Sequence, residues 1–317
     1  MTDIRPQDLP ELRAEIAEWL KGQDATRTWK RRVEGGVYEW ILNAARSKAD
    51  PAGAADYMRT RERDRLVGAT LFYVGAEMIE LAQAAARTIP NFDLEVEDLP
   101  APAGLMVFEK SIAVLPTSQT KLGTDTPIRA VSWDFRPHPN TASAAPVVFG
   151  SGYSERSEMQ PAYDRIGWTN RFAGHPRLFQ EVGTEFVWQC RSGQGIPTVD
   201  RPMIAELGPI LRSAWLLMSQ PLACDAEVEA DRAAKKRVRR AGYEPSPVRV
   251  IELRRPKSSG DGDGESNYQH RWIVRGHWRN HWHPKREVHR PVWIAPHVKG
   301  PEGAPMIGGE KVYAWKR

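Results

Sequence analysis

The spacing of apolar residues changes along this chain, and that change restricts the fold more than any other feature of the sequence. Up to about residue 99 the apolar residues recur every three or four positions, as on one side of a helix. After the proline-rich break at Pro100–Pro102 they alternate with polar residues, as in half-buried strands. Helical spacing returns at 203, and alternation returns at 248. This pattern predicts an α+β protein with a helical N-terminal part, a mixed middle part and a small basic antiparallel β module at the C-terminus.

The same periodicities predict the individual elements. We expect helices over 11–20, 24–46, 54–87, 203–220 and 225–241. We expect strands over 105–115, 128–135, 146–150, 185–190, 248–254, 268–283, 288–295 and 311–316. Composition shifts divide these elements into three regions: a helical region at 1–99, a β-rich region at 100–202, and a region at 203–317 with two helices and the β module. The mixed-sign run Arg59–Arg65 is interpreted as a solvated helix face with local ion pairs.

Composition indicates the broad class. With 317 residues, 41% of them hydrophobic and 27% charged, the chain has the make-up of a globular protein and not of a disordered one. Two cysteines, Cys190 and Cys224, are too few for a disulfide framework, so we expect a cytoplasmic location. The sequence has no signal-peptide pattern and no run of 18 apolar residues, so we expect the protein to be neither secreted nor inserted in a membrane. No nucleotide-binding loop or paired-cysteine zinc motif occurs, so we expect no cofactor and no metal.

Positive charge is concentrated in the last third. Residues 225–317 contain 20 Lys and Arg against 12 Asp and Glu, whereas residues 1–224 carry a small net negative charge. Six of the eight histidines and five of the 12 tryptophans also lie after residue 224. Such a basic region on a slightly acidic body predicts a polyanionic partner. A basic surface that only keeps a small β module in solution is the alternative interpretation.

One segment of this region has the character of a binding site. If 270–283 is a strand, Trp272, Trp278 and Trp282 lie on one face, and the cationic and imidazole side chains lie on the other. A row of such groups about 7 Å apart matches an extended phosphate backbone. The residues expected to bind nucleic acid are Arg275, His277, Arg279 and His281 on this strand, Arg290 and Lys299 beyond it, and Lys235, Lys236, Arg239 and Arg240 on the preceding helix. An exposed Trp282 or Trp293 could stack on a base.

The C-terminal hundred residues also resemble a known group of sequences. The segments SAWLLMSQPLAC (213–224), HRWIVRGHWRNHWH (270–283) and VHRPVWIAPHVKGPEGAPMI (288–307) are similar to a family of uncharacterised actinobacterial proteins from plasmid, phage or integrated-element surroundings. The resemblance implies a mobile-element context and no particular activity, and it does not extend to the first two hundred residues. From this resemblance and the basic C-terminal region together, we expect a nucleic-acid-binding protein with a regulatory or mobile-element role, acting on DNA or RNA.

Other interpretations of the same residues stay open. A metal-independent ribonuclease or toxin-like enzyme would use His277 and His281 as the catalytic acid and base, with Arg275 or Arg279 on the phosphate. Four residues of a straight strand span about 13 Å, however, so the two imidazoles would need a bend to meet. A zinc site at the histidines is disfavoured because the interleaved arginines repel a dication. In a third interpretation, the tryptophan-rich module docks a protein partner and has no nucleic-acid role.

Overall fold

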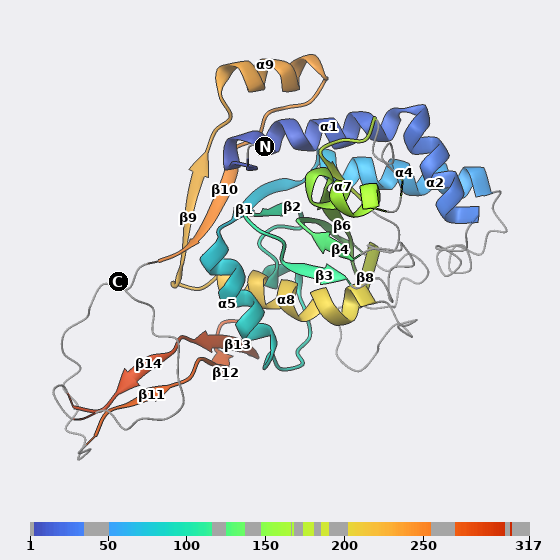
Figure 1. Cartoon of the computed structure of the whole chain (residues 1–317). Coiled ribbons are helices and arrows are strands. Elements are labelled where there is room, and N and C mark those ends of the chain that lie inside the picture. Colours follow the sequence, from blue (N-terminus) through green and yellow to red (C-terminus); the bar gives the residue numbers. More distant parts are fainter. Residues whose placement is uncertain are drawn as a thin grey trace.

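A mixed β-sheet forms the centre of the molecule, and helices cover both of its faces (Figure 1). The computed structural model describes residues 3–34, 51–115, 125–136, 147–165, 167, 174–180, 185–189, 202–254, 270–301 and 305. Its helices are α1 (Leu9–Lys21), α2 (Gln23–Glu34), α4 (Pro51–Val67), α5 (Ala76–Ala86), α7 (Arg156–Arg165), α8 (Pro202–Met218) and α9 (Arg232–Arg240).

The sheet contains strands from all three regions of the sequence. Its order is β7 (Leu178–Phe179), β6 (Val147–Glu155), β5 (Ala130–Arg136), β2 (Ala103–Phe108), β1 (Thr70–Val74), β10 (Val248–Leu253) and β9 (Ala223–Val228), and β8 (Glu185–Gln189) pairs with β6. Strand β1 is parallel to β2 and β10, whereas the other pairs are antiparallel. Three smaller pairs are β3 (Ala113–Leu115) with β4 (Thr126–Ile128), β11 (Trp272–Val274) with β14 (His297–Lys299), and β12 (His277–His283) with β13 (Val288–Ile294).

Both faces of the sheet are buried, which gives the molecule three layers. Successive side chains of β1 point to opposite faces, so Leu71 and Tyr73 pack with α1, α2 and α4, while Phe72 and Val74 pack with α5 and α8. The two cores therefore share the sheet and do not share helices. The helix α9 continues the first layer because it packs on α1, and Figure 1 shows it outermost on that side.

The predicted α+β class is confirmed, including the small antiparallel pairs near the C-terminus. The prediction of one continuous helix over 54–87 is wrong, because the chain forms α4, β1 and α5 there. Six residues, ATLFYV, stand between Gly68 and Gly75 as a largely apolar run, and such a run is typical of a strand that is buried on both faces. A strand buried on both faces has no polar alternation, so it resembles part of a helical stripe.

Smaller differences concern the last third of the described chain. The helix expected over 225–241 begins only at Arg232, because the preceding residues form β9. The strand expected over 268–283 is interrupted at Arg275 and Gly276, and β14 was not expected. The strand expected over 311–316 and the second half of the helix expected over 24–46 lie outside the described residues. Among the described helices, none is long and apolar enough to cross a membrane.

Candidate nucleic-acid interface

The hairpin formed by β12 and β13 is fixed to the body at its base by two tryptophans. Trp278 and Trp293 are cross-strand partners with ring centroids 5.3 Å apart, and they lie against the core around α5 and α8. The indole of Trp278 donates to the carbonyl of Ala85 at the end of α5 (2.9 Å), and the side chain of Gln220 accepts from the backbone N–H of Trp293 (3.2 Å). Two large apolar rings and two hydrogen bonds therefore hold one face of the hairpin.

Ion pairs fix the other end of the hairpin. Arg286 and Arg290 pair with Glu95 and Asp98, which flank and end the short 3-10 helix η2 (Val96–Asp98). Arg290 lies 2.7 Å from Glu95 and 3.3 Å from Asp98. The hydrogen bond from Arg290 is the main reason that the pKa of Glu95 lies below its usual range. The hairpin is thus attached at both ends, and the acidic residues at 95–98 are the partners that sequence analysis missed.

The side chains left exposed on the hairpin are those expected to contact phosphate. His277, Arg279 and His281 are exposed on consecutive outward positions of β12. Arg279 Nη2 lies 3.2 Å from Nδ1 of His281, so these two groups converge. The ring of His281 also approaches that of His283, with centroids 5.2 Å apart. A cation with adjacent imidazoles offers several donors to one phosphate group, which is the chemistry that the sequence predicts.

Trp282 is exposed although it shares a strand face with the anchored Trp278. Its side chain keeps 45% of its surface accessible, and its ring lies 4.9 Å from that of His289. Two-stranded ribbons twist more strongly than larger sheets, so a face that packs on the body at the base of the hairpin turns away from it near the tip. Of the two tryptophans considered for stacking, Trp282 is therefore accessible and Trp293 is buried.

Arg290, which was expected to bind nucleic acid, is buried. Arg290 is the cross-strand partner of the exposed His281, yet its side chain is only 8% exposed because of the ion pairs with Glu95 and Asp98. Arg290 therefore anchors the hairpin and is not accessible to a phosphate. Arg275 is exposed between β11 and β12, and Lys299 is exposed on β14. The structure thus keeps Arg275, His277, Arg279 and His281 on one exposed segment.

The basic residues expected on the preceding helix lie far from the hairpin. Lys235, Lys236, Arg239 and Arg240 are on α9, which packs on α1 at one outer side of the molecule. The hairpin contacts α8, on the opposite face of the sheet, and Figure 1 shows the two elements at opposite ends. The two basic surfaces are therefore separated by the three layers, roughly 30 Å if each layer is about 10 Å thick.

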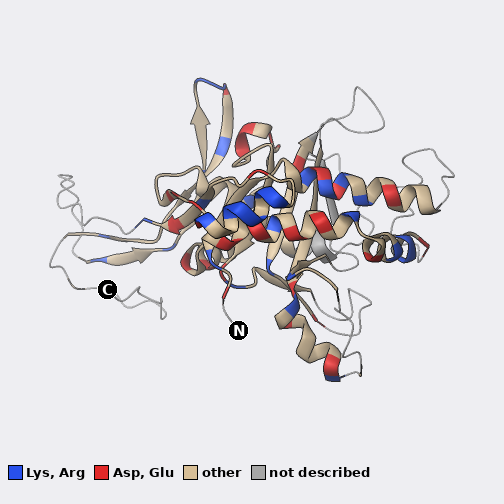
Figure 2. Cartoon of the chain, turned by 90° about the horizontal axis from the view of Figure 1, so that it is seen from above, with Lys and Arg blue, Asp and Glu red and all other residues tan. Residues whose placement is uncertain are grey.

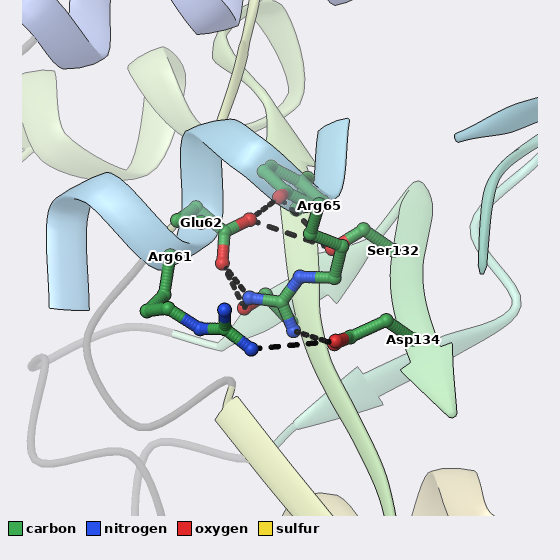
Figure 3. A network of polar contacts seen from close by, with 7 residues as sticks. Arg61, Glu62, Arg65, Ser132 and Asp134 are labelled. Atoms are coloured by element: carbon green, nitrogen blue, oxygen red, sulfur yellow. Dashed lines mark hydrogen bonds and ion pairs between the residues drawn. The ribbon is translucent and has the colours of Figure 1, made fainter. Parts of the chain in front are cut away.

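A second group of polar side chains lies inside the molecule, between α4 and the sheet (Figure 3). The carboxylate of Glu62 accepts hydrogen bonds from Tyr153, Ser132 and Ser151, and it pairs with Arg65. Arg65 also lies 3.7 Å from Asp134, and Arg61 lies 4.0 Å from the same carboxylate. The interpretation of 59–65 as a solvated face is therefore wrong for Glu62 and Arg65, whose side chains are buried.

The buried Glu62 cluster serves to hold α4 on strands β5 and β6. Glu62 is 1% exposed, so no substrate reaches its carboxylate. Sequence analysis did not identify the cluster because Ser132, Ser151 and Tyr153 come from distant parts of the chain. Within the described residues there is also no group of three or more side chains arranged to hold a metal ion. The exposed face of the hairpin therefore remains the best candidate for a functional site.

Comparisons with known proteins add little to this geometry. No known protein family matches the sequence, and no curated protein matches it significantly. Among solved structures, the crystal structure of AcrVA2 is similar over 92% of this chain and 94% of that chain, with 13% sequence identity and a TM-score of 0.42. Similarity at this level does not establish a common function. Function has to be inferred from the side chains of this chain.

Proposed function

We propose that this protein binds nucleic acid through the sugar–phosphate backbone, with the outward face of the β12–β13 hairpin as the contact surface. The observation that carries the proposal is that His277, Arg279 and His281 stay exposed on a strand whose other face is anchored by Trp278 and Trp293. A rigid element that presents a converged cation and imidazoles costs little conformational entropy on binding.

The exposed Trp282, on the face of β12 opposite to Arg279 and His281, offers a ring on which an unpaired base can stack, so the hairpin is proposed to bind single strands as well as duplexes. Single-strand binding combines cations along the backbone with aromatic rings on which bases stack, and Trp282 lies next to His281 on β12 and against His289 on β13. A regulatory or mobile-element role, and a cytoplasmic location, are part of the same proposal. The first rests on the resemblance of the C-terminal hundred residues, and the second on the low cysteine content.

A salt titration with labelled oligonucleotides tests the proposal. Binding of a single strand of about 20 nucleotides and of the corresponding duplex, as DNA and as RNA, is measured by fluorescence anisotropy from low to physiological salt. The variant Arg279→Ser is expected to weaken binding about tenfold and to flatten the slope of log K against log salt by roughly 0.7 for a single strand. Arg31→Ser, which removes an exposed charge on α2, is the matched control and is expected to change neither quantity.

Two results would reject the proposal. One is the absence of retention at low salt for all four nucleic acids, which would favour a protein-docking role for the module. The other is equal weakening by Arg279→Ser and Arg31→Ser, which would indicate a non-specific charge effect.

Phosphodiester cleavage is the second candidate function, and the structure favours a different pair of histidines for it than the sequence does. His277 and His281 lie four residues apart on one uninterrupted strand, so the chain does not provide the bend that this catalytic pair would need. His281 and His283 approach each other instead, with Arg279 beside them. Gel analysis of the binding samples, without added metal, tests this function: shortened RNA that disappears in His281→Ala would establish it.

A further inference from the structure

The helix α9 presents a row of unpaired cations that the hairpin site does not use. Ala234 and Val238 are buried and hold the helix on α1. Arg232, Lys236 and Arg240 are exposed, and no ion pair joins any of them to the described part of the chain. Figure 2, which views the molecule from the α9 side, shows Lys and Arg along this helix and mixed charges on the longer helix beneath it.

The other basic residues of α9 are neutralised by carboxylates. Lys235 pairs with Glu229, Arg237 lies 2.9 Å from Glu11 on α1, and Arg239 lies 3.5 Å from Glu244. These contacts fix the helix and its flanking loops to the body. The division of roles is thus clear: one set of cations attaches α9, and the set opposite to the buried Ala234 and Val238 faces solvent.

The unpaired cations have a spacing that suits a phosphate backbone. Arg232, Lys236 and Arg240 follow each other at intervals of four residues, which is about 6 Å along a helix axis with a rotation of only about 40° per step. The row is therefore about 12 Å long, and a duplex strand advances about 3.4 Å per phosphate, so three or four phosphates fit along it. Asp231 caps the helix through the N–H of Ala234 (2.8 Å), so the row is held on an ordered helix.

We propose that α9 is a second phosphate-backbone site, and that one chain therefore holds two separate nucleic-acid segments and bridges them. The proposal deepens the function proposed above and rests on it. It follows from the location of the two surfaces, since α9 covers the α1 side of the sheet and the hairpin covers the α8 side. A stiff duplex that lies on one of these surfaces cannot bend around the molecule to the other.

The chemistry of α9 favours a nucleic acid over a lipid surface. A helix that lies in a membrane interface needs an apolar face for insertion, and the apolar residues Ala234 and Val238 are already buried against the protein. The outward face offers only cations, of which two are arginines that can contact phosphate oxygens with two donors. Charge complementarity is therefore the whole basis of recognition at this surface, and a salt-sensitive affinity is expected.

A bridging assay tests the proposal on the full chain. A biotinylated DNA duplex of about 14 bp is immobilised on beads, the protein is added, and capture of a second, fluorescent duplex of the same length is measured. Isothermal titration calorimetry gives the number of duplexes per chain in parallel. We expect two duplexes per wild-type chain and efficient capture. The triple variant Arg232→Ser, Lys236→Ser, Arg240→Ser is expected to bind one duplex and to lose capture at least about tenfold, while its thermal unfolding stays unchanged.

The control separates position from charge. The control variant removes three cations from exposed positions of α2, by Arg27→Ser, Lys30→Ser and Arg31→Ser. This variant is expected to bridge two duplexes like the wild type. Arg279→Ser combined with His281→Ser is expected to leave one duplex bound at α9. Bridging that survives in the α9 variant overturns the proposal, since two hairpins of a self-associated chain would then hold both duplexes.

The remaining outcomes distinguish the two proposals. A stoichiometry of one that depends on the hairpin residues alone overturns the second site and leaves the first. A stoichiometry of one that depends on α9 alone overturns bridging and the hairpin function together, and makes α9 the single site. Retention of the protein on vesicles with about 20% phosphatidylserine, lost in the α9 variant, with no duplex bound there, would assign this surface to a membrane and overturn the proposal.

Discussion

Replacing Glu62 by Gln is the sharpest test of how α4 is held on the sheet. Gln has nearly the same shape as Glu but carries no charge and replaces one acceptor oxygen by a donor. The hydroxyl groups of Ser132, Ser151 and Tyr153 can turn to accept from the new amide N–H, whereas the guanidinium of Arg65 can only donate and therefore cannot pair with it. The substitution therefore leaves Arg65 as a buried cation whose next carboxylate, that of Asp134, is 3.7 Å away.

The expected loss of stability follows from this stranded charge. Breaking a buried ion pair from one side costs about 3–5 kcal/mol, and the nearby Asp134 places Glu62→Gln at the lower end, about 3 kcal/mol. With a urea dependence of about 3 kcal/mol per molar, the unfolding midpoint would fall by about 1 M. Urea titrations followed by circular dichroism measure this shift. Glu77→Gln, on the exposed side of α5, is the control and is expected to stay within about 0.5 kcal/mol of the wild type.

The double variant Glu62→Gln/Arg65→Met decides whether the charge is the cause. If the loss comes from an unpaired guanidinium, removing that group restores stability, and the double variant is at least as stable as Glu62→Gln. Losses that simply add would show that Glu62 and Arg65 act independently, and the stranded charge of Arg65 would be refuted as the cause. A shift below about 0.5 kcal/mol in Glu62→Gln alone would refute it as well.

The hairpin gives three further predictions. Arg290 lowers the pKa of Glu95, so the stability that this pair contributes is present above the ordinary pKa of 4.5 and is lost as the pH falls through the lowered pKa. Glu95→Gln should therefore destabilise the protein at neutral pH and much less at a pH of about 3. Urea unfolding at the two pH values measures this difference. Glu287 has a positive φ of 51° in the β12–β13 turn, so Glu287→Gly should raise the melting temperature, with a gain of about 1 kcal/mol. Trp282→Ala should weaken single-strand binding by about 1–3 kcal/mol at unchanged thermal stability, whereas Trp278→Ala should lower the stability by about 3 kcal/mol. Loss of stability in Trp282→Ala with loss of binding alone in Trp278→Ala would contradict the assigned roles.

The sequence predicts most of the elements of the fold because their signals are local. The alternation over 128–135 and 248–254 corresponds closely to β5 and β10, and the stripe over 203–220 corresponds to α8. Local signals do not determine which strands become neighbours. Strand β10, from the last third of the chain, lies beside β1 in the centre of the sheet, and nothing in either segment specifies that pairing.

The buried cluster around Glu62 illustrates a second limit. The charged residues in the run Arg59–Arg65 have the composition of an exposed helix face, and several of them are partly exposed. Glu62 and Arg65 are buried because Ser132, Ser151 and Tyr153, which come from strands much later in the sequence, supply hydroxyl groups around the carboxylate. Burial of a charge thus depends on partners that only the tertiary fold assembles, and a single helix does not reveal them.

The hairpin shows why the residues of a candidate site can be predicted from the sequence, whereas the exposure of their side chains cannot. Alternation places Trp278 and Trp282 on one face and His281 with its cross-strand partner Arg290 on the other, and the structure keeps that division. The body covers one member of each pair and leaves the other exposed, because Trp278 packs against the core at the base of the hairpin and Arg290 forms ion pairs with Glu95 and Asp98. The alternation of side chains between the two faces of a strand is set by the backbone, whereas the exposure of each side chain depends on what packs against each end of the hairpin. The phosphate-binding hypothesis therefore keeps Arg279 and His281, loses Arg290 to the ion pairs with Glu95 and Asp98, and keeps Trp282, not Trp293, as the ring on which a base can stack.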